Sequence, residues 1–309
     1  MKKILVTGGC GFIGSNFIHY VNKHTDFGVV CMDCLTYAGK VENINSLLGD
    51  RVSFVNADIR HDIESALKMH DIHAIVNFAA ESHVDNSIRN PTIFLETNVM
   101  GTLNLLLFAK HKGIRHVQIS TDEVYGALDK DGKAFTEETT IRPNSPYSAS
   151  KAGADLFAMS FHHTFGTDVV ITRCSNNYGP MQFQEKMIPK CIMNALNGQK
   201  IPVYGRGDQI RDWIHVEDHC RGILKALVEG KSGEVYNFGG GNQITNMDLV
   251  KRLLKLCGKS EDLIQFVDDR PGHDFRYDVD YSKSKQELKW EPSYDFDEGL
   301  KQTVCWYAK

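Results

Sequence analysis

Short apolar runs of strand length recur along residues 1–174 and alternate with segments of helix length. Their near-continuous apolar character differs from the apolar/polar alternation of a half-exposed strand. Strands of this kind are typical of a parallel sheet that is covered by helices on both faces. We therefore predict an α/β fold built on a doubly wound parallel sheet. The runs are KKILVTG, GVVCMD, VSFVNAD, HAIVNFAA, HVQIST and DVVITRC.

The rest of the chain is less regular. Strand-like and helix-like stretches are separated by polar loops, and no repeat or flexible linker divides them. A chain of 309 residues is also longer than one hydrophobic core usually serves. We predict a smaller α/β substrate lobe that is interleaved with the main domain. The main domain is expected at 1–174 plus about 210–240, and the smaller lobe at about 175–209 and 241–309.

Composition and charge exclude several classes of protein. The chain is 42% hydrophobic and 24% charged, and its net charge of -4 comes without a Lys/Arg-rich block. From the strand-like start MKKILVTGGC we expect no leader sequence, and we expect no apolar segment of about 18 residues. The eight cysteines are scattered, and the one CxxC, at Cys31 and Cys34, lacks a second pair. We expect a cytoplasmic protein with reduced cysteines, no metal, no membrane segment and no nucleic-acid partner.

Three glycines lie where the first strand meets the first helix. Gly8, Gly11 and Gly14 in VTGGCGFIGSNF follow a GxxGxxG spacing, which allows a tight turn and close approach to a pyrophosphate at the helix N-terminus. Asp33 ends the second strand 19 residues after Gly14, where a carboxylate can bind ribose hydroxyls and would repel a 2′-phosphate. The pattern predicts a Rossmann-type site for NAD rather than NADP. The alternative is a turn that only packs helix on strand.

Two later strands end in residues that can border the same cofactor. Asp58 and Ile59 follow the third strand, and we place them beside the adenine. Ala79, Ala80 and Ser82 follow the fourth strand and are expected along the rest of the cofactor. Ligands of doubly wound sheets bind at the carboxyl ends of the strands, so these positions share one edge.

A tyrosine and a lysine lie four residues apart in NSPYSASKAGAD. On a helix, Tyr147 and Lys151 share one face, and the ammonium is expected to lower the pKa of the phenol towards working pH. Tyr147 would then act as a base, with Thr121 bonding the same substrate oxygen. The alternative is that Tyr147 and Lys151 form an ordinary pair on a surface helix, without a chemical role. Tyr281 and Lys285 repeat the spacing but belong to the smaller lobe, so we discount them.

The segment ISTDEVYGAL places two adjacent acids, Asp122 and Glu123, where a strand runs out into a loop. A solvated loop pair is common in proteins, but this one follows Thr121 at the strand end that faces Tyr147. Ionising one carboxyl raises the pKa of its neighbour, so one can act as a base and the other as an acid.

Several motifs resemble the extended short-chain dehydrogenase/reductase family: TGGCGFIG, STDEVYG and YSASK, in this order and at these separations. Within it the chain is similar to nucleoside-diphosphate-glucose 4,6-dehydratases, above all the dTDP-glucose enzymes, nearly end to end. Cys10, Phe78 and Met187 depart from the usual residues, and none removes a group with a chemical role. The closer similarity is carried by AAESHVDNSI, STDEVYG, RCSNNYGP, EKMIP, RDWIHVEDH and RPGHDFRY.

The resemblance implies a chemical use for both acids. Oxidation of the sugar C4 hydroxyl by NAD makes C5–H acidic, and loss of the C6 hydroxyl then needs a base at C5 and an acid at C6. Glu123 would be the base and protonated Asp122 the acid, after which the hydride returns to C6. The net reaction is a dehydration that yields a 4-keto-6-deoxy sugar, so the expected enzyme is a hydro-lyase.

The expected site residues form three sets. The catalytic residues are Thr121, Asp122, Glu123, Tyr147 and Lys151. The NAD-binding residues are Gly8, Gly11, Phe12, Ile13, Gly14, Asp33, Leu35, Thr36, Asp58, Ile59, Phe78, Ala79, Ala80, Ser82, Thr97, Tyr147 and Lys151. By resemblance, the nucleotide-sugar residues are Ser82, His83, Thr121, Asn176, Asn177, Lys186, Met187, Pro202, Tyr204, Arg211, Asn246, Arg270, His273 and Tyr277.

Other functions and partners stay open at this point. Thymine and uracil differ by one methyl, worth about 1–3 kcal/mol, so UDP-glucose or another nucleoside-diphosphate-hexose is an alternative substrate. A nucleotide-sugar C4 epimerase would share Tyr147 and Lys151 but needs no pair of acids, and an inactive NAD-binding module would need neither. We also expect a homodimer, because the stretches at 90–111 and 152–165 are apolar on more than one helical face.

Overall fold

A seven-stranded parallel sheet forms the centre of the larger lobe in the computed structural model, which describes residues 1–269 and 273–309. The strand order is β10-β6-β5-β4-β1-β2-β3, and each neighbouring pair runs parallel. This confirms the predicted doubly wound sheet. The strands are β1 Lys3–Thr7, β2 Gly28–Asp33, β3 Val52–Asn56, β4 Ile72–Asn77, β5 Arg115–Ile119, β6 Val169–Cys174 and β10 Val235–Phe238.

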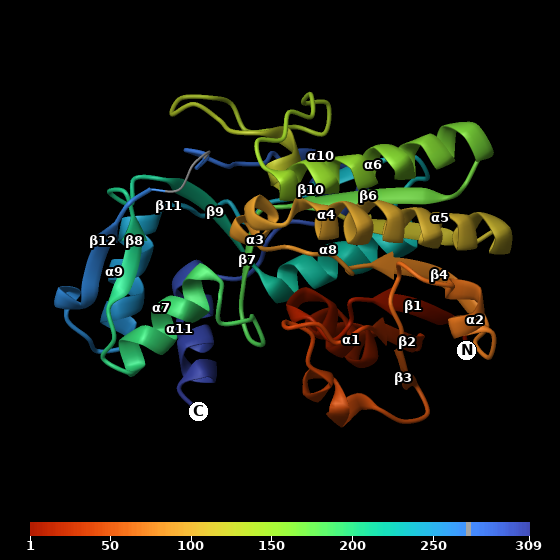
Figure 1. The fold of residues 1–309 in the computed structure, drawn as a ribbon, viewed down its shortest axis with the longest axis horizontal. Coiled ribbons are helices and arrows are strands. Elements are labelled where there is room, and N and C mark those ends of the chain that lie inside the picture. Colours follow the sequence, from red (N-terminus) through yellow and green to blue (C-terminus); the bar gives the residue numbers. More distant parts are fainter. Residues whose placement is uncertain (270–272) are drawn as a thin grey trace.

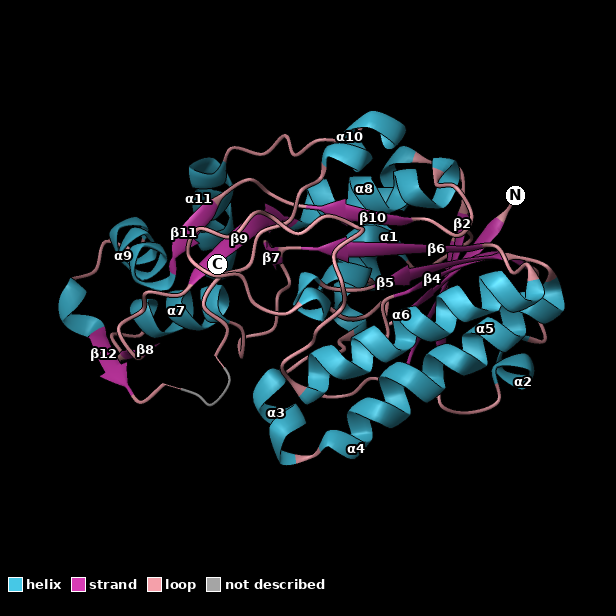
Figure 2. Cartoon of the chain, turned by 90° about the horizontal axis from the view of Figure 1, so that it is seen from above, coloured by secondary structure: helices cyan, strands magenta, loops and turns pink. Residues whose placement is uncertain are grey.

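Helices cover both faces of this sheet. Figure 2 shows α5 and α6 along one face and α8 along the other, with α1 beside α8. The longer helices are α1 Phe12–His24, α5 Gly101–Lys112, α6 Pro146–Phe165 and α8 Val216–Glu229. Shorter turns of helix are η1 Val41–Asn43, η2 Asn45–Leu47, α2 Ile63–Leu67, α3 Val84–Arg89, α4 Pro91–Phe94, the π-helix η3 Leu95–Met100, η4 Asp122–Tyr125 and α10 Ser282–Leu288.

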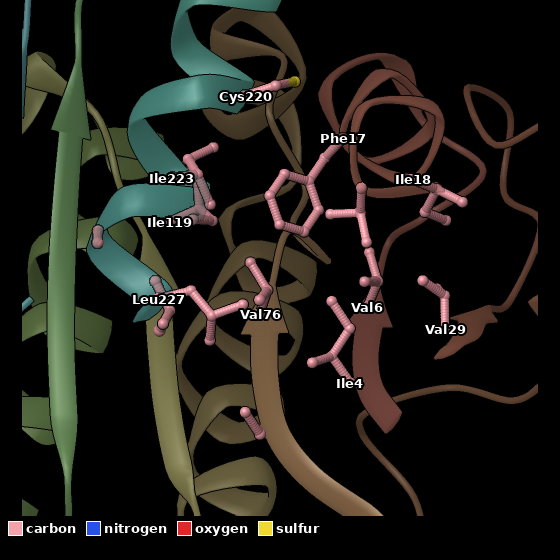
Figure 3. Close-up of a cluster of buried hydrophobic side chains, with 14 of the residues drawn as sticks. Ile4, Val6, Phe17, Ile18, Val29, Val76, Ile119, Cys220, Ile223 and Leu227 are labelled. Atoms are coloured by element: carbon pink, nitrogen blue, oxygen red, sulfur yellow. The ribbon is translucent and has the colours of Figure 1, made fainter. Parts of the chain in front are cut away.

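The core forms because successive strand residues point to opposite faces. On one face, Ile4 and Val6 pack under Phe17 and Ile223, from α1 and α8 (Figure 3). On the other face, Leu5 belongs to a separate buried cluster. Burying each such side chain contributes about 1.5–3 kcal/mol, which explains why strands buried on both faces read as continuous apolar runs.

The smaller lobe has its own core and lies at the opposite end of the molecule from the free ends of α5 and α6 (Figure 1). Its two small sheets have the orders β11-β9-β7 and β12-β8. Its strands are β7 Asn176–Tyr178, β8 Ile201–Tyr204, β9 Ile210–His215, β11 Gln243–Thr245 and β12 Ile264–Val267. Its helices are α7 Met187–Leu196, α9 Asn246–Leu256, η5 Glu261–Leu263 and α11 Phe296–Tyr307.

The lobes interleave, but two segments differ from the predicted boundaries. Strand β9, which we assigned to the main domain, pairs with β7 and β11 of the smaller lobe. It joins the two cores, because Trp213 packs in one and Ile214 in the other. Residues 282–290, which we assigned to the smaller lobe, pack on the main domain, where Trp290 stacks edge-on against Phe238 at 4.7 Å. Burial of the Trp290 ring against Phe238 accounts for the place of 282–290 on the main domain.

Helix α4, η3 and α5 form one continuous helical stretch, Pro91–Lys112, of 22 residues. By length and composition alone it could cross a membrane, which differs from the expectation that the chain holds no apolar segment of about 18 residues, because its polar residues are spread along it. Half of its most apolar window is buried inside the protein. A core helix of a soluble protein meets the same test, so the stretch is weak evidence for a membrane segment.

Candidate active site

The glycine loop between β1 and α1 is shaped for close backbone approach. Gly8 has a φ of 65°, and a Cβ atom on it would lie 2.6 Å from the backbone nitrogen of Ala79. A Cβ atom on Gly14 would lie 2.3 Å from the carbonyl oxygen of Gly8. Gly11, at the N-cap of α1, has no side chain to cap the first amides. The loop can therefore present free N–H groups to a pyrophosphate.

Asp33 at the end of β2 holds the next turn. Its Oδ2 accepts a hydrogen bond from Cys10 N at 3.0 Å, and its Oδ1 accepts one from Leu35 N at 2.8 Å. The second bond stabilises Leu35 in a left-handed conformation with a φ of 53°. Burial raises the pKa of Asp33, and the two amides oppose that shift. Asp33 thus lies buried at the edge where a ribose would bind.

One cavity of about 420 Å³ extends from the glycine loop to the smaller lobe. Every residue predicted to bind NAD lines it except Leu35, which packs against the core cluster beneath β1 and β2. The predicted residues in its wall are Gly8, Gly11, Phe12, Ile13, Gly14, Asp33, Thr36, Asp58, Ile59, Phe78, Ala79, Ala80, Ser82, Thr97, Tyr147 and Lys151.

The two acids begin a short helix, η4, directly after β5. Thr121 is its N-cap: its hydroxyl accepts a hydrogen bond from Glu123 N at 3.3 Å and donates one to Asp122 Oδ1 at 3.2 Å. This turn directs both acids to the wall of the cavity, which Tyr147 and Lys151 also line. The structure therefore brings all five predicted catalytic residues to one site.

Helix α6 positions the tyrosine and the lysine. It begins with a capping box between Ser145 and Ser148 and with Pro146 in its first turn, so its start is well defined. Tyr147 and Lys151 are buried one turn apart. Lys151 Nζ donates a hydrogen bond to the carbonyl oxygen of Ile119 at 2.6 Å, which ties the helix to the end of β5.

Burial dominates the ionisation of this cluster. It raises the pKa of Asp122 well above the usual range, and the charges of Glu123 and Asp212 add to the shift. It also raises the pKa of Tyr147, while a hydrogen bond with Thr121 lowers it. It lowers the pKa of Lys151. Our expectation that Lys151 lowers the pKa of Tyr147 is wrong for this arrangement, because burial outweighs any help from the ammonium, which faces a backbone carbonyl.

Six residues predicted for the nucleotide sugar line the same cavity: Ser82, Thr121, Asn176, Asn177, Lys186 and Met187. Lys186 Nζ donates to the carbonyl oxygen of Ser82 at 2.8 Å, across the gap between the lobes. His83 lies beside this wall rather than in it. Its ring accepts the Asn86 amide at the start of α3, and its Nε2 lies 3.9 Å from Glu185.

The other predicted substrate residues form a second group in the smaller lobe, outside the cavity wall. The ring of Tyr204 lies 6.1 Å from that of His273, and the Arg211 guanidinium lies over the ring of Tyr277 at 4.4 Å. Arg211 Nη2 also donates to the carbonyl oxygen of Asp274 at 2.9 Å. The positive charge of Arg211 opposes the rise in the pKa of Asp122, so this second group acts electrostatically on the catalytic acids.

Two further predicted substrate residues, Pro202 and Asn246, also lie in the smaller lobe. Asn246 begins α9, and its amide donates to Gln209 O at 2.9 Å, while Pro202 lies on β8 two residues before Tyr204. Arg270 lies outside the described residues.

Sequence reasoning missed several charged residues of the cavity wall. Glu81 and Glu185 line it, and Tyr37 donates a hydrogen bond to Glu185 at 3.4 Å. Arg60 lines it and bonds Asp58 at 2.6 Å. Glu81 and Glu185 each lie next to a residue that was predicted, within motifs used for the resemblance, so a closer reading of AAESHVD and QEKMIP could have found them.

The cysteines provide no metal site. Within residues 1–269 and 273–309, no group of three or more His, Cys, Asp or Glu side chains could hold a metal ion. Cys31 lies 3.8 Å from Cys10, sulfur to sulfur, and both are free thiols.

The fold and this site define a Rossmann-type protein of the extended short-chain dehydrogenase/reductase class. The sequence model of the GDP-mannose 4,6 dehydratase family matches residues 5–303. The chain belongs to this family.

Individual relatives and solved structures show the similarity in more detail. The chain is 48% identical to the dTDP-glucose 4,6-dehydratase of Streptomyces niveus, covering 99% of this chain and 92% of the relative. The crystal structure of the dTDP-glucose 4,6-dehydratase from Streptomyces venezuelae, with NAD and TYD bound, matches with a TM-score of 0.96 and 46% identity over 99% of this chain and 97% of that one. The UDP-glucose 4-epimerase of Thermotoga maritima, solved with UDP-glucose, matches with a TM-score of 0.92 at 30% identity, covering 99% and 98%.

Proposed function

We propose that this protein is an NAD-dependent dTDP-glucose 4,6-dehydratase, a hydro-lyase that forms the 4-keto-6-deoxy sugar. One observation carries the proposal: Asp122 and Glu123 line the same cavity as Tyr147 and Lys151. The relatives named dTDP-glucose 4,6-dehydratase, at 46–48% identity, support the same activity.

The cavity fits a dinucleotide. Gly8 and Gly14 leave no room for a side chain where the pyrophosphate would lie, and Asp33 offers a buried carboxylate at the ribose end. When bound, NAD supplies the acceptor that takes hydrogen from C4 of the sugar and returns it to C6. Asp33 favours NAD, because a 2′-phosphate would meet its negative charge.

Tyr147 and Thr121 act at the C4 oxygen of the sugar. Tyr147 accepts the proton of the C4 hydroxyl, and Thr121 bonds the same oxygen. Both side chains are buried, so the proton moves within a site that is shielded from water. For this step Tyr147 must be a phenolate, which burial opposes. Lys151 lies one helical turn away, and its ammonium would have to turn from the carbonyl oxygen of Ile119 towards Tyr147 to stabilise that phenolate.

Glu123 and Asp122 carry out the elimination. Glu123 removes the C5 proton, and Asp122 donates a proton to the leaving C6 hydroxyl. Asp122 must hold a proton near neutral pH for this role, and burial beside Glu123 raises its pKa in the required direction. Glu123 is half-buried and lines the same cavity, so it is the acid that is placed to act as base.

The second group in the smaller lobe would bind the nucleotide. Arg211 provides a bidentate cation for the diphosphate, and Tyr204 and His273 offer rings beside the base. Binding there requires Arg211 to exchange the backbone carbonyls that it now bonds for phosphate oxygens. The thymine methyl is worth only about 1–3 kcal/mol, so UDP-glucose is the nearest competing substrate.

An epimerase is the second candidate, because the epimerase of Thermotoga maritima shares the fold at a TM-score of 0.92. The two adjacent acids favour dehydration over epimerisation, since an epimerase removes no hydroxyl. Incubation with dTDP-glucose and with UDP-glucose, followed by alkali, distinguishes these functions. A dehydratase gives the absorbance of a 4-keto-6-deoxy sugar, faster with dTDP-glucose, whereas an epimerase gives a C4 epimer and no such absorbance.

We further propose that the protein is a homodimer through α5 and α6. Leu95, Met100 and Leu107 on the first helical stretch are 49–56% exposed, and Leu156 and Phe157 on α6 are 59% and 42% exposed. Adjacent helices that expose large apolar side chains are typical of an interface between subunits. A monomeric mass in sedimentation at micromolar concentration would refute the dimer, and Leu156→Glu should dissociate it.

A cytoplasmic location is also proposed, without membrane or nucleic-acid partners. All eight cysteines are free, as is usual in a reducing compartment, and the net charge is -4. The dimer would cover the exposed face of Pro91–Lys112. Fractionation of cells without detergent should leave the protein in the supernatant.

A further inference from the structure

Helix α6 carries a third polar side chain below Tyr147 and Lys151. Asp155 follows Lys151 by one turn on the same face of the helix, and only 1% of it is exposed. It does not line the cavity, so it has no direct part in the chemistry above. A buried carboxylate is costly unless charged or hydrogen-bonding partners compensate it, so its partners show what it does.

Two side chains from neighbouring strands bind the same oxygen of Asp155. Ser120 Oγ donates to Oδ2 at 2.9 Å from the end of β5, and Arg173 Nε donates to it at 2.9 Å from β6. Arg173 is also buried, and its guanidinium lies 4.8 Å from the centre of the Tyr125 ring. Asp155 therefore joins α6 to the ends of the two central strands.

The position of Ser120 makes this junction relevant to the active site. Ser120 directly precedes Thr121, and its neighbour Ile119 accepts the hydrogen bond from Lys151 Nζ at 2.6 Å. Two consecutive residues of the acid-bearing segment are thus held by two residues of α6, Lys151 and Asp155. These two bonds tie the segment that carries Asp122 and Glu123 to the helix that carries Tyr147.

Asp155 also acts on the charge of Lys151. Burial lowers the pKa of Lys151, whereas the negative charge of Asp155 raises it, as does the Cys174 thiol of β6. Tyr147 on the same helix and Asp122 and Glu123 on η4 line the cavity together with Lys151. Arg173 pairs with Asp155 and lies over the ring of Tyr125.

We propose that Asp155 is a positioning residue for the dehydration, which fixes the Thr121–Glu123 segment through Ser120 and places a negative charge one helical turn from Lys151. The inference rests on the proposed function.

Three substitutions separate these roles. Asp155→Asn keeps an oxygen that can accept from Ser120 and Arg173 but removes the charge. Ser120→Ala removes the hydrogen bond and leaves the ion pair. Asp168→Asn is the matched control, because Asp168 pairs with Arg115 Nε at 2.9 Å between the opposite ends of the same two strands.

The charge role is tested by titration of Lys151 in enzyme that contains ¹³C-labelled lysine, with the Cε resonance assigned from a Lys151→Arg variant. We expect Lys151 to titrate at lower pH in Asp155→Asn than in the wild type, and the alkaline limb of kcat/KM to move in the same direction. Asp168→Asn should leave both unchanged. If Asp155→Asn does not fold, Arg173→Gln tests the same point with the opposite sign, because Asp155 then acts on Lys151 without a competing cation.

The positioning role is tested by Ser120→Ala. We expect kcat to fall about tenfold or more with KM and the pH profile unchanged, since misplaced acids weaken general catalysis without altering binding. Wild-type kcat in Ser120→Ala, or an unshifted Lys151 titration in folded Asp155→Asn, would overturn the proposal. The titration needs no turnover, so a wild-type enzyme that fails to convert dTDP-glucose would instead contradict the proposed function.

Discussion

The backbone of Gly8 lies so close to that of Ala79 that a Cβ atom on Gly8 would lie 2.6 Å from the Ala79 nitrogen. This contact joins the end of β1 to the end of β4, and both residues line the cavity. Any side chain at Gly8 must displace one of the two strand ends and with it the floor of the cofactor site.

Gly8→Ala should therefore lower the affinity for NAD by about tenfold or more, which corresponds to ~1.4 kcal/mol. The NAD content of purified protein and isothermal titration measure this. Gly166→Ala is the matched control: Gly166 has a similar φ of 67°, but nothing lies within 4 Å of an added Cβ. It should cost about 1 kcal/mol of stability and no NAD affinity. Equal loss of NAD in both variants would mean that backbone strain, rather than the Ala79 contact, is responsible.

NAD should stay bound and should not be consumed. The cofactor is reduced and reoxidised within one turnover, so its release midway would strand a keto intermediate. We expect turnover by the purified protein without added NAD, and no accumulation of NADH in the medium. Sustained production of NADH in proportion to substrate would identify an ordinary dehydrogenase.

Glu123→Gln and Asp122→Asn should stop elimination at different points. Without Glu123 no base removes the C5 proton, so neither product nor solvent deuterium at C5 is expected. With Asp122→Asn, Glu123 still exchanges the C5 proton, while elimination slows by about 10²–10⁴-fold. Mass spectrometry and NMR of the sugar in deuterated water distinguish the two. Exchange in Glu123→Gln but none in Asp122→Asn would reverse the assignment of roles.

The raised pKa of Asp122 also predicts how stability depends on pH. A carboxyl whose pKa is higher in the folded state stabilises the protein at pH values below its unfolded pKa, and this stabilisation is lost as pH rises through the folded value. Asp122→Asn should therefore gain stability over the wild type as pH rises. Urea unfolding across pH measures it, with the exposed Asp129→Asn as control. If the difference in unfolding free energy between Asp122→Asn and the wild type does not change with pH, ionisation of Asp122 does not destabilise the folded state.

Much of this site could be predicted from the sequence because it rests on short-range patterns. The glycine loop, Asp33 and the Tyr147–Lys151 spacing each lie within one turn or helix, and the strand ends bring them to one edge. The ionisation of Tyr147 could not be predicted in this way, since it depends on burial by elements far apart in the sequence. Spacing alone gave the wrong direction.

Contacts between residues far apart in the sequence account for the other differences between prediction and structure. The substrate residues on β9 and at 273–277 are joined by a bridge between Ile210 and Arg276, and Tyr204 on β8 contacts His273. These contacts are distant in the sequence, which therefore did not show that the residues form a group apart from the cavity. Burial of Trp290 against Phe238 likewise assigns 282–290 to the larger lobe, although the chain reaches it from the smaller one.

The most direct test of dehydration at this site follows one hydrogen atom of the substrate. The protein is incubated with dTDP-glucose that carries deuterium at C4, and the product is examined by NMR. We predict a 4-keto-6-deoxy sugar with that deuterium at C6 and a solvent-derived hydrogen at C5. Deuterium returned to C4 of a galactose or glucose product, or lost to the medium, would contradict dehydration by this site.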